Sequence, residues 1–423
     1  MSRFWCHGSA GAACVKKFVI LLQLSVNDIN SRGKSSNCNV PGYQVSKQVS
    51  GLITEQKPEL TKKAMFHYHG AGSLQTAANS ALCRKVLPWQ DIMNDSSKDP
   101  HPFLSLTPEK VLESVESIGL ITDGCMLALN SYENRVYQVG IEEDQPVIVK
   151  FYRPGRWNQA QILEEHAFIH ELAEQDLSVV EPLVSQDCTL HFSEPFWFAV
   201  YPRRGGRSPD LDRETLEVLG RCLGKLHAVG ATKPFSYRYT FSVAAHGETS
   251  CRFLMDAGFI PGELQQAYST LTNDLLARIR KIFSECGSME YIRLHGDCHT
   301  GNILWRDGIP HLVDFDDCMN GPAIQDLWML LSGERDQQEA QLAALMDGYL
   351  MFHDFEPREL RLIEAMRTLR LMYYAAWLAR RWDDPAFPHS FTWFNTLRYW
   401  STHVLELREQ LSVLDEPPLQ LRL

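Results

Sequence analysis

The feature that most constrains this chain is a short span rich in ionisable side chains, "HGDCHTGNILWRDGIPHLVDFDD", at residues 295–317. It contains three histidines, one cysteine and five aspartates. Two kinds of site could use them. His295, Cys298 and His299 could supply the nitrogen and sulfur ligands of a zinc ion. Alternatively, the aspartates carry the chemistry, and the histidines and the cysteine only support them.

The spacing does not support a zinc site. Structural zinc is held by four cysteine or histidine ligands, usually in two spaced pairs. Cys298 and His299 are adjacent and point in different directions, and Cys318 lies nineteen residues beyond His299. The eleven cysteines of the chain include no C-x-x-C pair, so neither a zinc ribbon nor a disulfide framework is predicted. Such cysteines suit a reducing compartment, and we expect a cytoplasmic location.

The aspartates fit a different pattern, H-x-D-x-x-x-x-N, which is the catalytic loop of kinases. His295, Asp297 and Asn302 occupy its defined positions. In that mechanism the Asp accepts the proton of the acceptor hydroxyl or orients it, and the Asn binds Mg²⁺. Asp314 follows Asn302 by twelve residues, at the end of a strand-like run, where kinases carry the metal-binding Asp of D-F-G. Mg²⁺ prefers such oxygen ligands.

A lysine that completes the pattern lies upstream, at the end of "PVIVK". Lys150 corresponds to the lysine of V-A-I-K, which binds the α- and β-phosphates of ATP and pairs with a glutamate on a helix. Glu164 and Glu165 both lie on the next predicted helix; we favour Glu165 and keep Glu164 as the alternative. Each residue alone would be an ordinary surface side chain. Their shared order and spacing indicate a kinase.

Charge divides the chain into two parts. Residues 1–92 hold 11 of its 41 Lys and Arg but only 4 of its 52 Asp and Glu. This part is rich in turn residues and lacks hydrophobic periodicity, so we expect a disordered extension, or one translated from a start upstream of a natural Met93. Its apolar run "KKFVILLQLSV" is too short to span a bilayer. The net charge of −11 argues against nucleic acid, and we expect a monomer without nucleic-acid or membrane partners.

Beyond residue 104 the pattern predicts an α+β fold. A helix should start at Pro108, capped by Thr107. Strands are predicted at 134–142, 146–152, 189–193 and 196–202, with a helix at 158–176 between the second and third. The rest is mainly helical, most clearly at 213–230 and 359–382. The prediction is a bilobal, protein-kinase-like enzyme, with a small antiparallel-sheet N-lobe (93–204) and a larger, mainly helical C-lobe (205–423).

Further stretches carry a family resemblance: "LNSYENRVYQV", "VKFYRP", "RWNQAQILEEH", "LHGDCHTGNILWRDG", "NGPAIQDLWMLL", "RRWDDPAFP" and "EPPLQL". With them, residues 105–423 resemble the bacterial stress response kinase A family, which are Ser/Thr protein kinases with the aminoglycoside phosphotransferase and choline kinase type of fold. The resemblance implies an ATP- and Mg²⁺-dependent protein kinase of a stress response. It implies Asp297 as proton acceptor, Asn302 and Asp314 as Mg²⁺ ligands, and Ser131 as a residue that contacts ATP.

The sequence departs from ordinary protein kinases in two places. The expected nucleotide loop, "NSYENRVYQ", has no glycine, so other backbone N–H groups must cover the phosphates, with help from the Ser131 hydroxyl and the Asn134 amide. D-F-G is replaced by D-F-D at 314–316 and no A-P-E follows, so we expect no regulation by an activation loop. Asp326 either accepts hydrogen bonds from the catalytic loop or is an ordinary carboxylate at a helix terminus.

Two other functions stay open at this point. A small-molecule kinase for an aminoglycoside, choline or homoserine would use the same chemistry on another acceptor, and the acidic catalytic part would attract a cationic substrate. A pseudokinase that only binds partners would be favoured if Lys150, Asp297, Asn302 or Asp314 were replaced, and none is.

The composition break leads to a prediction about the extension. A chain that starts at Met93 should fold with unchanged helical content and transfer phosphate as fast as the full chain, because the core pattern begins only near Leu104. Circular dichroism and a phosphotransfer assay on both chains test this. An insoluble or inactive shortened chain would show that residues 1–92 are needed.

Overall fold

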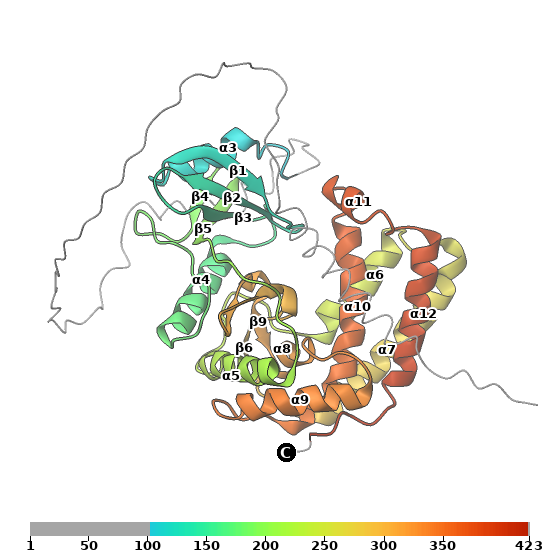
Figure 1. Cartoon of the computed structure of the whole chain (residues 1–423). Coiled ribbons are helices and arrows are strands. Elements are labelled where there is room, and N and C mark those ends of the chain that lie inside the picture. The colour runs from blue at the N-terminus through green and yellow to red at the C-terminus, as the bar shows by residue number, and fades with distance from the viewer. Residues whose placement is uncertain (1–101, 422–423) are drawn as a thin grey trace, which may run out of the picture. The chain divides into compact units, whose positions relative to one another are not determined.

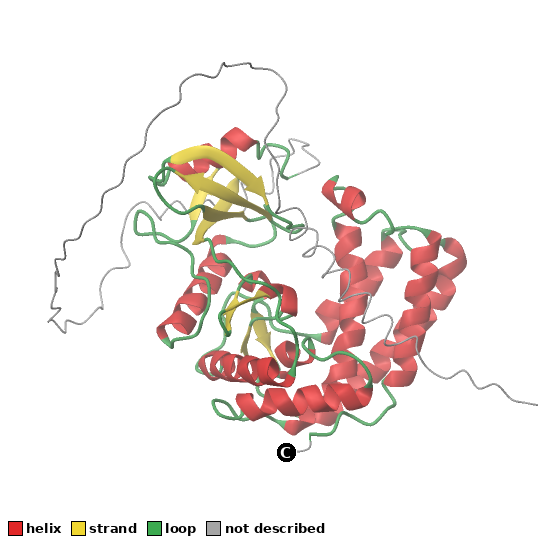
Figure 2. Ribbon diagram, in the orientation of Figure 1, coloured by secondary structure: helices red, strands yellow, loops and turns green. Residues whose placement is uncertain are grey.

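An antiparallel sheet and a helical region make up residues 102–421, which a computed structural model describes (Figure 1). Figure 2 shows the strands gathered in the first part and helices dominating the second. The predicted α+β fold with a sheet-containing N-lobe and a helical C-lobe is confirmed. The extension expected at residues 1–92 lies outside the described residues.

The N-lobe is a five-stranded antiparallel sheet in the order β1-β2-β3-β5-β4. Its strands are β1 (Thr122–Ala128), β2 (Arg135–Ile141), β3 (Val147–Phe151), β4 (His191–Ser193) and β5 (Phe196–Pro202). Helix α3 (Pro108–Glu116) precedes them and starts as predicted, with the Thr107 hydroxyl accepting a hydrogen bond from the Lys110 N–H. Val111 and Val115 of α3 join Phe151 and Phe198 of the sheet in one buried cluster.

Strand β1 is the strand of the five-stranded sheet that the sequence does not predict. Most of its side chains are exposed, so it lacks the alternation of buried apolar residues that marks a half-buried strand. Gly124 has φ +78°, and the pairing with β2 is irregular between Thr122 and Met126. This irregular strand lies at the edge of the sheet. Its sequence therefore shows no regular alternation of apolar and polar residues from which a strand could be predicted.

Helix α4 (Gln159–Glu174) connects the two hydrophobic cores. It begins with a capping box, in which Asn158 and Gln161 each accept a hydrogen bond from the other's backbone N–H. Ile162, near its start, packs in a small cluster with Tyr152 of the N-lobe. Phe168, further along, belongs to the large C-lobe core. The position of α4 therefore depends on both lobes.

The C-lobe contains the predicted helix at 213–230 as α5 (Arg213–Gly230). The predicted helix at 359–382 is a 3-10 turn (Pro357–Leu362) followed by α10 (Ile363–Arg380). The other helices are α6 (Thr249–Asp256), α7 (Gly262–Cys286), α8 (Ile324–Trp328), α9 (Arg335–Tyr349), α11 (Ala386–Ser390) and α12 (Leu397–Val413). Within residues 102–421, no helix combines the length and apolar character needed to cross a membrane.

Two short strand pairs shape the functional part of the C-lobe. Strand β6 (Ile292–Leu294) pairs with β9 (Met319–Gly321), and β7 (Ile303–Arg306) pairs with β8 (Ile309–Leu312). The lobes are joined between the end of β5 and the start of α5. We propose this connection, which contains the predicted division between residues 204 and 205, as the boundary between the lobes.

Three glycines let α5 and α9 approach closely. A Cβ atom built on Gly220 would lie 2.0 Å from the Leu345 carbonyl oxygen, and one on Gly224 would lie 2.5 Å from that of Tyr349. A Cβ on Gly348 would lie 2.1 Å from the Glu217 carbonyl oxygen. Because these neighbours are backbone atoms, they cannot move aside as a side chain end could. The contact between the two helices therefore requires residues without a side chain.

This contact predicts that Gly220→Ala destabilises the protein, although alanine is the better helix former. We expect the free energy of unfolding to fall by about 1–3 kcal/mol, as for other overpacked interiors. Gly262→Ala is the matched control, since Gly262 starts α7 with no atom within 4 Å of its added Cβ. Urea unfolding of both variants measures the difference. Equal stability of the two variants would contradict the close approach.

Candidate active site

Lys150 lies at the centre of an ion-pair cluster between the lobes. It belongs to β3 and is buried, with 6% of its surface exposed. Its Nζ lies 3.0 Å from Asp316 Oδ1, 3.2 Å from Asp314 Oδ1 and 3.6 Å from Glu165 Oε1. Burial alone would lower the pKa of Lys150, but the three carboxylates hold it well above its ordinary value. The lysine therefore stays charged.

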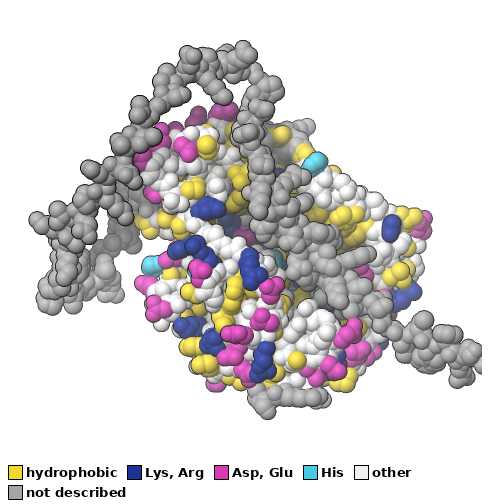
Figure 3. Space-filling view, in the orientation of Figure 1, with side chains coloured by type: hydrophobic (Ala, Val, Ile, Leu, Met, Phe, Trp, Pro, Cys, Tyr) yellow, Lys and Arg dark blue, Asp and Glu magenta, His cyan; other side chains and the backbone are white. Residues whose placement is uncertain are grey.

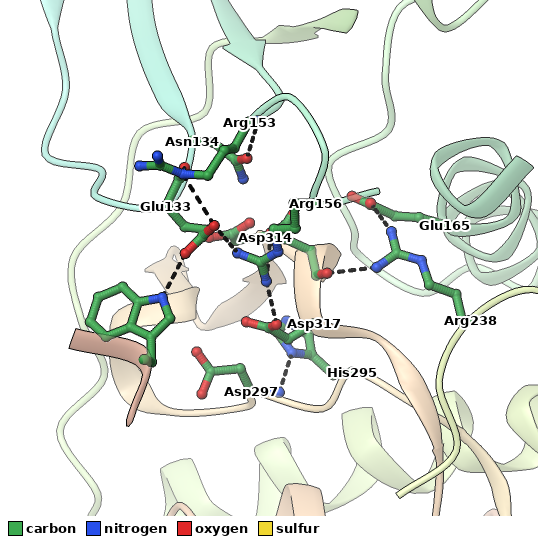
Figure 4. Close-up of polar contacts among 12 residues, drawn as sticks. Glu133, Asn134, Arg153, Arg156, Glu165, Arg238, His295, Asp297, Asp314 and Asp317 are labelled. Carbon is green, nitrogen blue, oxygen red and sulfur yellow. Dashed lines mark hydrogen bonds and ion pairs between the residues drawn. The ribbon is translucent and has the colours of Figure 1, made fainter. Parts of the chain in front are cut away.

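Glu165, and not Glu164, is the partner of Lys150. The Glu165 carboxylate is buried and also pairs with Arg238, as Figure 4 shows. Glu164 points elsewhere and accepts hydrogen bonds from the backbone N–H groups of Ser236 (2.5 Å), Tyr237 (2.8 Å) and Arg238 (2.8 Å). The two neighbouring glutamates therefore hold α4 in two ways, one against the lysine and one against a C-lobe loop.

A buried carboxylate braces the predicted catalytic loop. Asp326, on α8, accepts hydrogen bonds of 2.8 Å from the backbone N–H groups of both His295 and Gly296. Its Oδ2 also lies 3.2 Å from Nε2 of His227. Of the two interpretations of Asp326, the geometry therefore supports the one in which it binds the loop. Gly296 has φ +85°, and a Cβ there would lie 2.1 Å from the Asp317 carbonyl oxygen, so only glycine fits.

Asp297 projects from this loop beside three groups that favour its charged form. Arg370 Nη2 lies 2.7 Å from its Oδ1, and His299 Nε2 lies 3.4 Å from its Oδ2. Burial would raise the pKa of Asp297, but Arg370, His299 and His295 hold it well below its usual range. The carboxylate is partly exposed, with 22% of its side-chain surface accessible. It therefore stays ionised and within reach of another molecule.

Asn302 and Asp314 are brought together by the β7–β8 hairpin. Its register pairs Ile303 with Leu312, and the Val313 N–H donates to the Asn302 carbonyl oxygen at 3.1 Å. The Asn302 amide nitrogen donates to the Asp297 carbonyl oxygen at 3.0 Å, which leaves its amide oxygen for another partner. Asp314 follows the hairpin in the left-handed conformation (φ 60°, ψ 66°), with 55% of its side chain exposed.

The structure adds residues that sequence reasoning missed. Arg156 Nη2 pairs with Asp316 (3.0 Å) and Asp317 (2.5 Å), as Figure 4 shows for Asp317. Burial would raise the pKa of Asp316, but Arg156, Lys150 and Arg238 hold it well below its ordinary value. Burial raises the pKa of Asp317 to about 6, with Arg156 opposing this shift and the neighbouring carboxylates adding to it. Arg156 begins the stretch "RWNQAQILEEH", but the sequence assigns it no role, because its partners are far away along the chain.

Ser131 and Asn134 stabilise the glycine-free loop between β1 and β2. The Ser131 hydroxyl donates to the Asn134 carbonyl oxygen (3.2 Å) and accepts a hydrogen bond from the Val136 N–H (3.0 Å). The Asn134 side-chain oxygen accepts a hydrogen bond from the Arg153 N–H at 3.1 Å. A serine hydroxyl has two acceptor lone pairs, so Ser131 can accept one more hydrogen bond. The expected contact of Ser131 with ATP stays a prediction.

The two histidines considered as zinc ligands, His295 and His299, form hydrogen bonds with backbone groups of the same segment. His295 Nε2 lies 2.9 Å from the Val313 carbonyl oxygen, and its Nδ1 accepts a hydrogen bond from the Asp297 N–H at 3.3 Å. His299 Nδ1 accepts one from the Gly301 N–H. Cys298 is fully buried in the C-lobe core, and this burial raises the pKa of its thiol well above the ordinary value. Among residues 102–421, no three His, Cys, Asp or Glu side chains form a metal-binding group.

The brace predicts a stability effect of Asp326→Asn. The variant has one acceptor oxygen in place of two and directs an amide N–H₂ at a backbone N–H, so a buried donor loses its partner. We expect a free energy of unfolding lower by about 1–3 kcal/mol in a urea titration. Asp307→Asn, at an exposed turn with φ +54°, is the control and should unfold like the wild type. Wild-type stability of Asp326→Asn would show that the hydrogen bonds from His295 and Gly296 to Asp326 contribute little to stability.

Comparisons with known proteins identify the family of this chain. The model of the phosphotransferase enzyme family (APH) matches residues 126–363. Stress response kinase A of Escherichia coli (strain K12) is 42% identical over 330 residues, which cover 78% of this chain and 99% of that protein. Serine/threonine protein kinase RdoA of Salmonella typhimurium (strain LT2) is 42% identical over 332 residues, with the same coverage of 78% and 99%.

Solved structures share the fold at low sequence identity. Amicoumacin kinase hAmiN, in complex with AMP-PNP, Ca²⁺ and Ami, superposes with a TM-score of 0.57 at 20% identity, covering 74% of this chain and 94% of that one. A microcompartment-associated aminopropanol kinase superposes with a TM-score of 0.57 at 18% identity, covering 73% of this chain and 96% of that one. With the family match and the close relatives, the conclusion is that this chain belongs to the phosphotransferase enzyme family (APH) and is a kinase.

Proposed function

We propose that this kinase transfers the γ-phosphoryl group of ATP to Ser or Thr hydroxyls of proteins, as part of a bacterial stress response. The observation that carries the proposal is the arrangement of Lys150, Asp297, Asn302 and Asp314, which come from separate segments and meet between the lobes. The protein acceptor and the stress response rest on the names of relatives that are 42% identical.

Mg²⁺ fits the oxygen atoms that the site offers. Asp314 presents an exposed carboxylate of which only Oδ1 contacts Lys150, and Asn302 retains its amide oxygen. One or two protein oxygens suffice for Mg²⁺, because water and phosphate oxygens supply its other ligands. We propose that Asn302 and Asp314 hold the ion, which would neutralise the negative charge on the phosphates. Lys150, held by Glu165, would bind the α- and β-phosphates, and Ser131 would contact ATP from the glycine-free loop.

Asp297 is the proposed proton acceptor. Its low pKa makes it a weak base, which is sufficient because phosphoryl transfer passes through a loose transition state with little early proton loss. Arg370 holds Oδ1 at 2.7 Å, whereas His299 and Asn302 lie 3.4 Å from Oδ2, so Oδ2 is the less tightly held oxygen and would orient the acceptor hydroxyl. The main contribution of Asp297 is therefore the alignment of the hydroxyl, and proton acceptance follows.

A small-molecule acceptor is the second candidate. A pocket of about 270 Å³ adjoins Asp297 and has aromatic and arginine side chains in its lining, and its size suits a small hydroxyl compound. Two of the structures with the same fold are kinases of amicoumacin and of aminopropanol. The pseudokinase alternative is not favoured, because the side chains that phosphotransfer requires lie together.

We propose the cytoplasm as the place of action, and proteins rather than nucleic acids as partners. Buried cysteines with free thiols suit a reducing compartment: Cys222, Cys251, Cys286, Cys298 and Cys318. On the face that Figure 3 shows, Lys and Arg side chains are interspersed with Asp and Glu. The part of this face that the structure describes therefore has no continuous basic patch of the kind that binds nucleic acid.

Transfer of labelled phosphate from ATP to defined acceptors tests the proposal. Casein and myelin basic protein represent proteins, and choline, homoserine and kanamycin represent small molecules, each assayed with and without Mg²⁺. We expect Mg²⁺-dependent labelling of Ser or Thr in protein. Labelling of a small molecule alone would favour the second candidate, and Mg²⁺-independent transfer would contradict the metal site.

The proposed roles predict that substitution of Asp297 and of Asp314 impairs different steps, phosphate transfer in the first case and nucleotide binding in the second. Asp314→Asn loses a charged metal ligand and should bind Mg²⁺-ATP more weakly. Asp297→Asn should bind Mg²⁺-ATP almost normally but transfer phosphate about 10²- to 10⁴-fold more slowly, the usual contribution of a positioned base. Calorimetry and single-turnover transfer separate the two effects.

The control for both variants is Asp307→Asn, in the exposed turn of the same hairpin, which should behave like the wild type. The opposite result, in which Asp297→Asn loses nucleotide affinity and Asp314→Asn keeps it, would reverse the assignment.

A further inference from the structure

The glycine-free loop between β1 and β2 is tied to the C-lobe by its tip residue, Glu133. Arg381, which follows α10, donates to Glu133 Oε1 from Nε at 3.0 Å and from Nη2 at 2.7 Å. The indole N–H of Trp377, on α10, donates to Oε2 at 2.6 Å. Two donors from the C-lobe therefore hold one N-lobe carboxylate, of which only 12% of the side-chain surface is exposed.

A second set of contacts lies beside the first. Asp384 lies between α10 and α11. Its Oδ2 forms ion pairs with Arg153 Nη2 at 2.7 Å and with Arg135 Nη2 at 3.1 Å. The ring of Tyr132 packs on that of Phe391, with centroids 4.8 Å apart. We call this whole contact the latch. Its residues are Tyr132, Glu133, Arg135 and Arg153 in the N-lobe, and Trp377, Arg381, Asp384 and Phe391 in the C-lobe.

The latch forms one wall of the pocket that contains Asp297. Glu133, Trp377 and Arg381 line this pocket together with Asp297 and Arg370. Figure 4 shows Glu133 and Asp297 at the same site, with Asp317 between them. An acceptor hydroxyl that approaches Asp297 through the pocket therefore passes the contact between the nucleotide loop and α10.

The size of the pocket limits what can reach Asp297 while the latch is closed. Its volume of about 270 Å³ is below the ~300–1,000 Å³ of sites that hold drug-sized ligands. Water, which takes up about 30 Å³ in the liquid, or a small alcohol fits. A Ser or Thr within a polypeptide needs more room, because the chain must enter and leave on both sides of the reacting residue.

We propose that the latch determines which acceptors this kinase uses, with Glu133 and Arg381 as specificity-determining residues. Closed, it admits water and small hydroxyl compounds to Asp297; open, it admits a Ser or Thr of a protein. This inference rests on the proposed function, since it takes Asp297 as the group that receives the acceptor. Opening is feasible because Arg381 and Arg135 keep 27% and 18% of their side-chain surfaces exposed, so water can solvate these guanidinium groups when the ion pairs separate.

Weakening the latch tests the proposal. Glu133→Gln keeps the size of the side chain and removes its charge, and Arg381→Gln removes the guanidinium. For each variant we compare kcat/KM for casein with the rate at which the same enzyme hydrolyses ATP, where water is the acceptor. This ratio cancels changes in ATP binding or chemistry. We expect it to rise at least about fivefold, the factor that corresponds to a contact of ~1 kcal/mol.

Two further variants distinguish an effect of the latch from a general loss of structure. Tyr132→Ala weakens the latch from its aromatic side, without touching Glu133, and should raise the same ratio. Arg367→Gln is the matched control: it removes from α10 an arginine that pairs with Glu364 at 2.5 Å and has 11% of its side chain exposed, outside the latch. It should leave the ratio at the wild-type value.

Each outcome decides the question. A higher ratio in the three latch variants and not in the control supports the latch as the determinant of acceptor size. An unchanged ratio, or an equal loss of both activities, would show that the latch does not select acceptors. If the wild type binds Mg²⁺-ATP but phosphorylates no acceptor at all, the proposed function fails, whereas hydrogen exchange of residues 129–134 in the latch variants still reports whether the latch opens.

Discussion

The site depends on the burial of one positive charge, that of Lys150, among three carboxylates from two segments. A buried ammonium group is costly unless it is paired, and here Glu165 comes from α4 while Asp314 and Asp316 come from the segment after β8. Because the lysine belongs to the N-lobe sheet, these ion pairs join β3, α4 and the C-lobe. The geometry of the proposed metal ligand Asp314 is therefore set by a residue more than a hundred positions earlier in the sequence.

Arginines pair with the acids that lie beside the lysine, and a buried carboxylate accepts hydrogen bonds from the backbone of the catalytic loop. Arg156 and Arg238 offset the charge that Asp316 and Glu165 bring into the interior. Asp326 offers its two oxygens to two backbone N–H groups of the catalytic loop. Satisfied polar networks of this kind hold a site in one geometry before any ligand arrives, which is what phosphoryl transfer requires.

Motif spacing predicted the residues whose positions follow from local sequence. The kinase pattern located Lys150, Asp297 and Asp314, and hydrophobic periodicity located α4, α5 and most strands. Partners brought by tertiary contacts escaped prediction: Arg370 reaches Asp297 from 73 residues away, and nothing near it in the sequence marks it. The choice between Glu164 and Glu165 also needed the structure, since adjacent helix residues differ by about 100° in direction. Strand β1 was missed because its exposed side chains leave no pattern.

Arg156 connects the latch with the ion-pair cluster around Lys150. One of its nitrogens lies 3.4 Å from Glu133, at the tip of the nucleotide loop, and another pairs with Asp316 and Asp317 beside the proposed metal ligand. A change in the ion pair between Arg156 and Glu133 therefore alters the electrostatic potential at Asp316 and Asp317, and the reverse also holds. Thermodynamic linkage then makes the effect mutual: to whatever extent bound nucleotide shifts the affinity for the acceptor, bound acceptor shifts the affinity for nucleotide by the same factor. A single guanidinium thus gives this kinase a route for cooperativity between its two substrates.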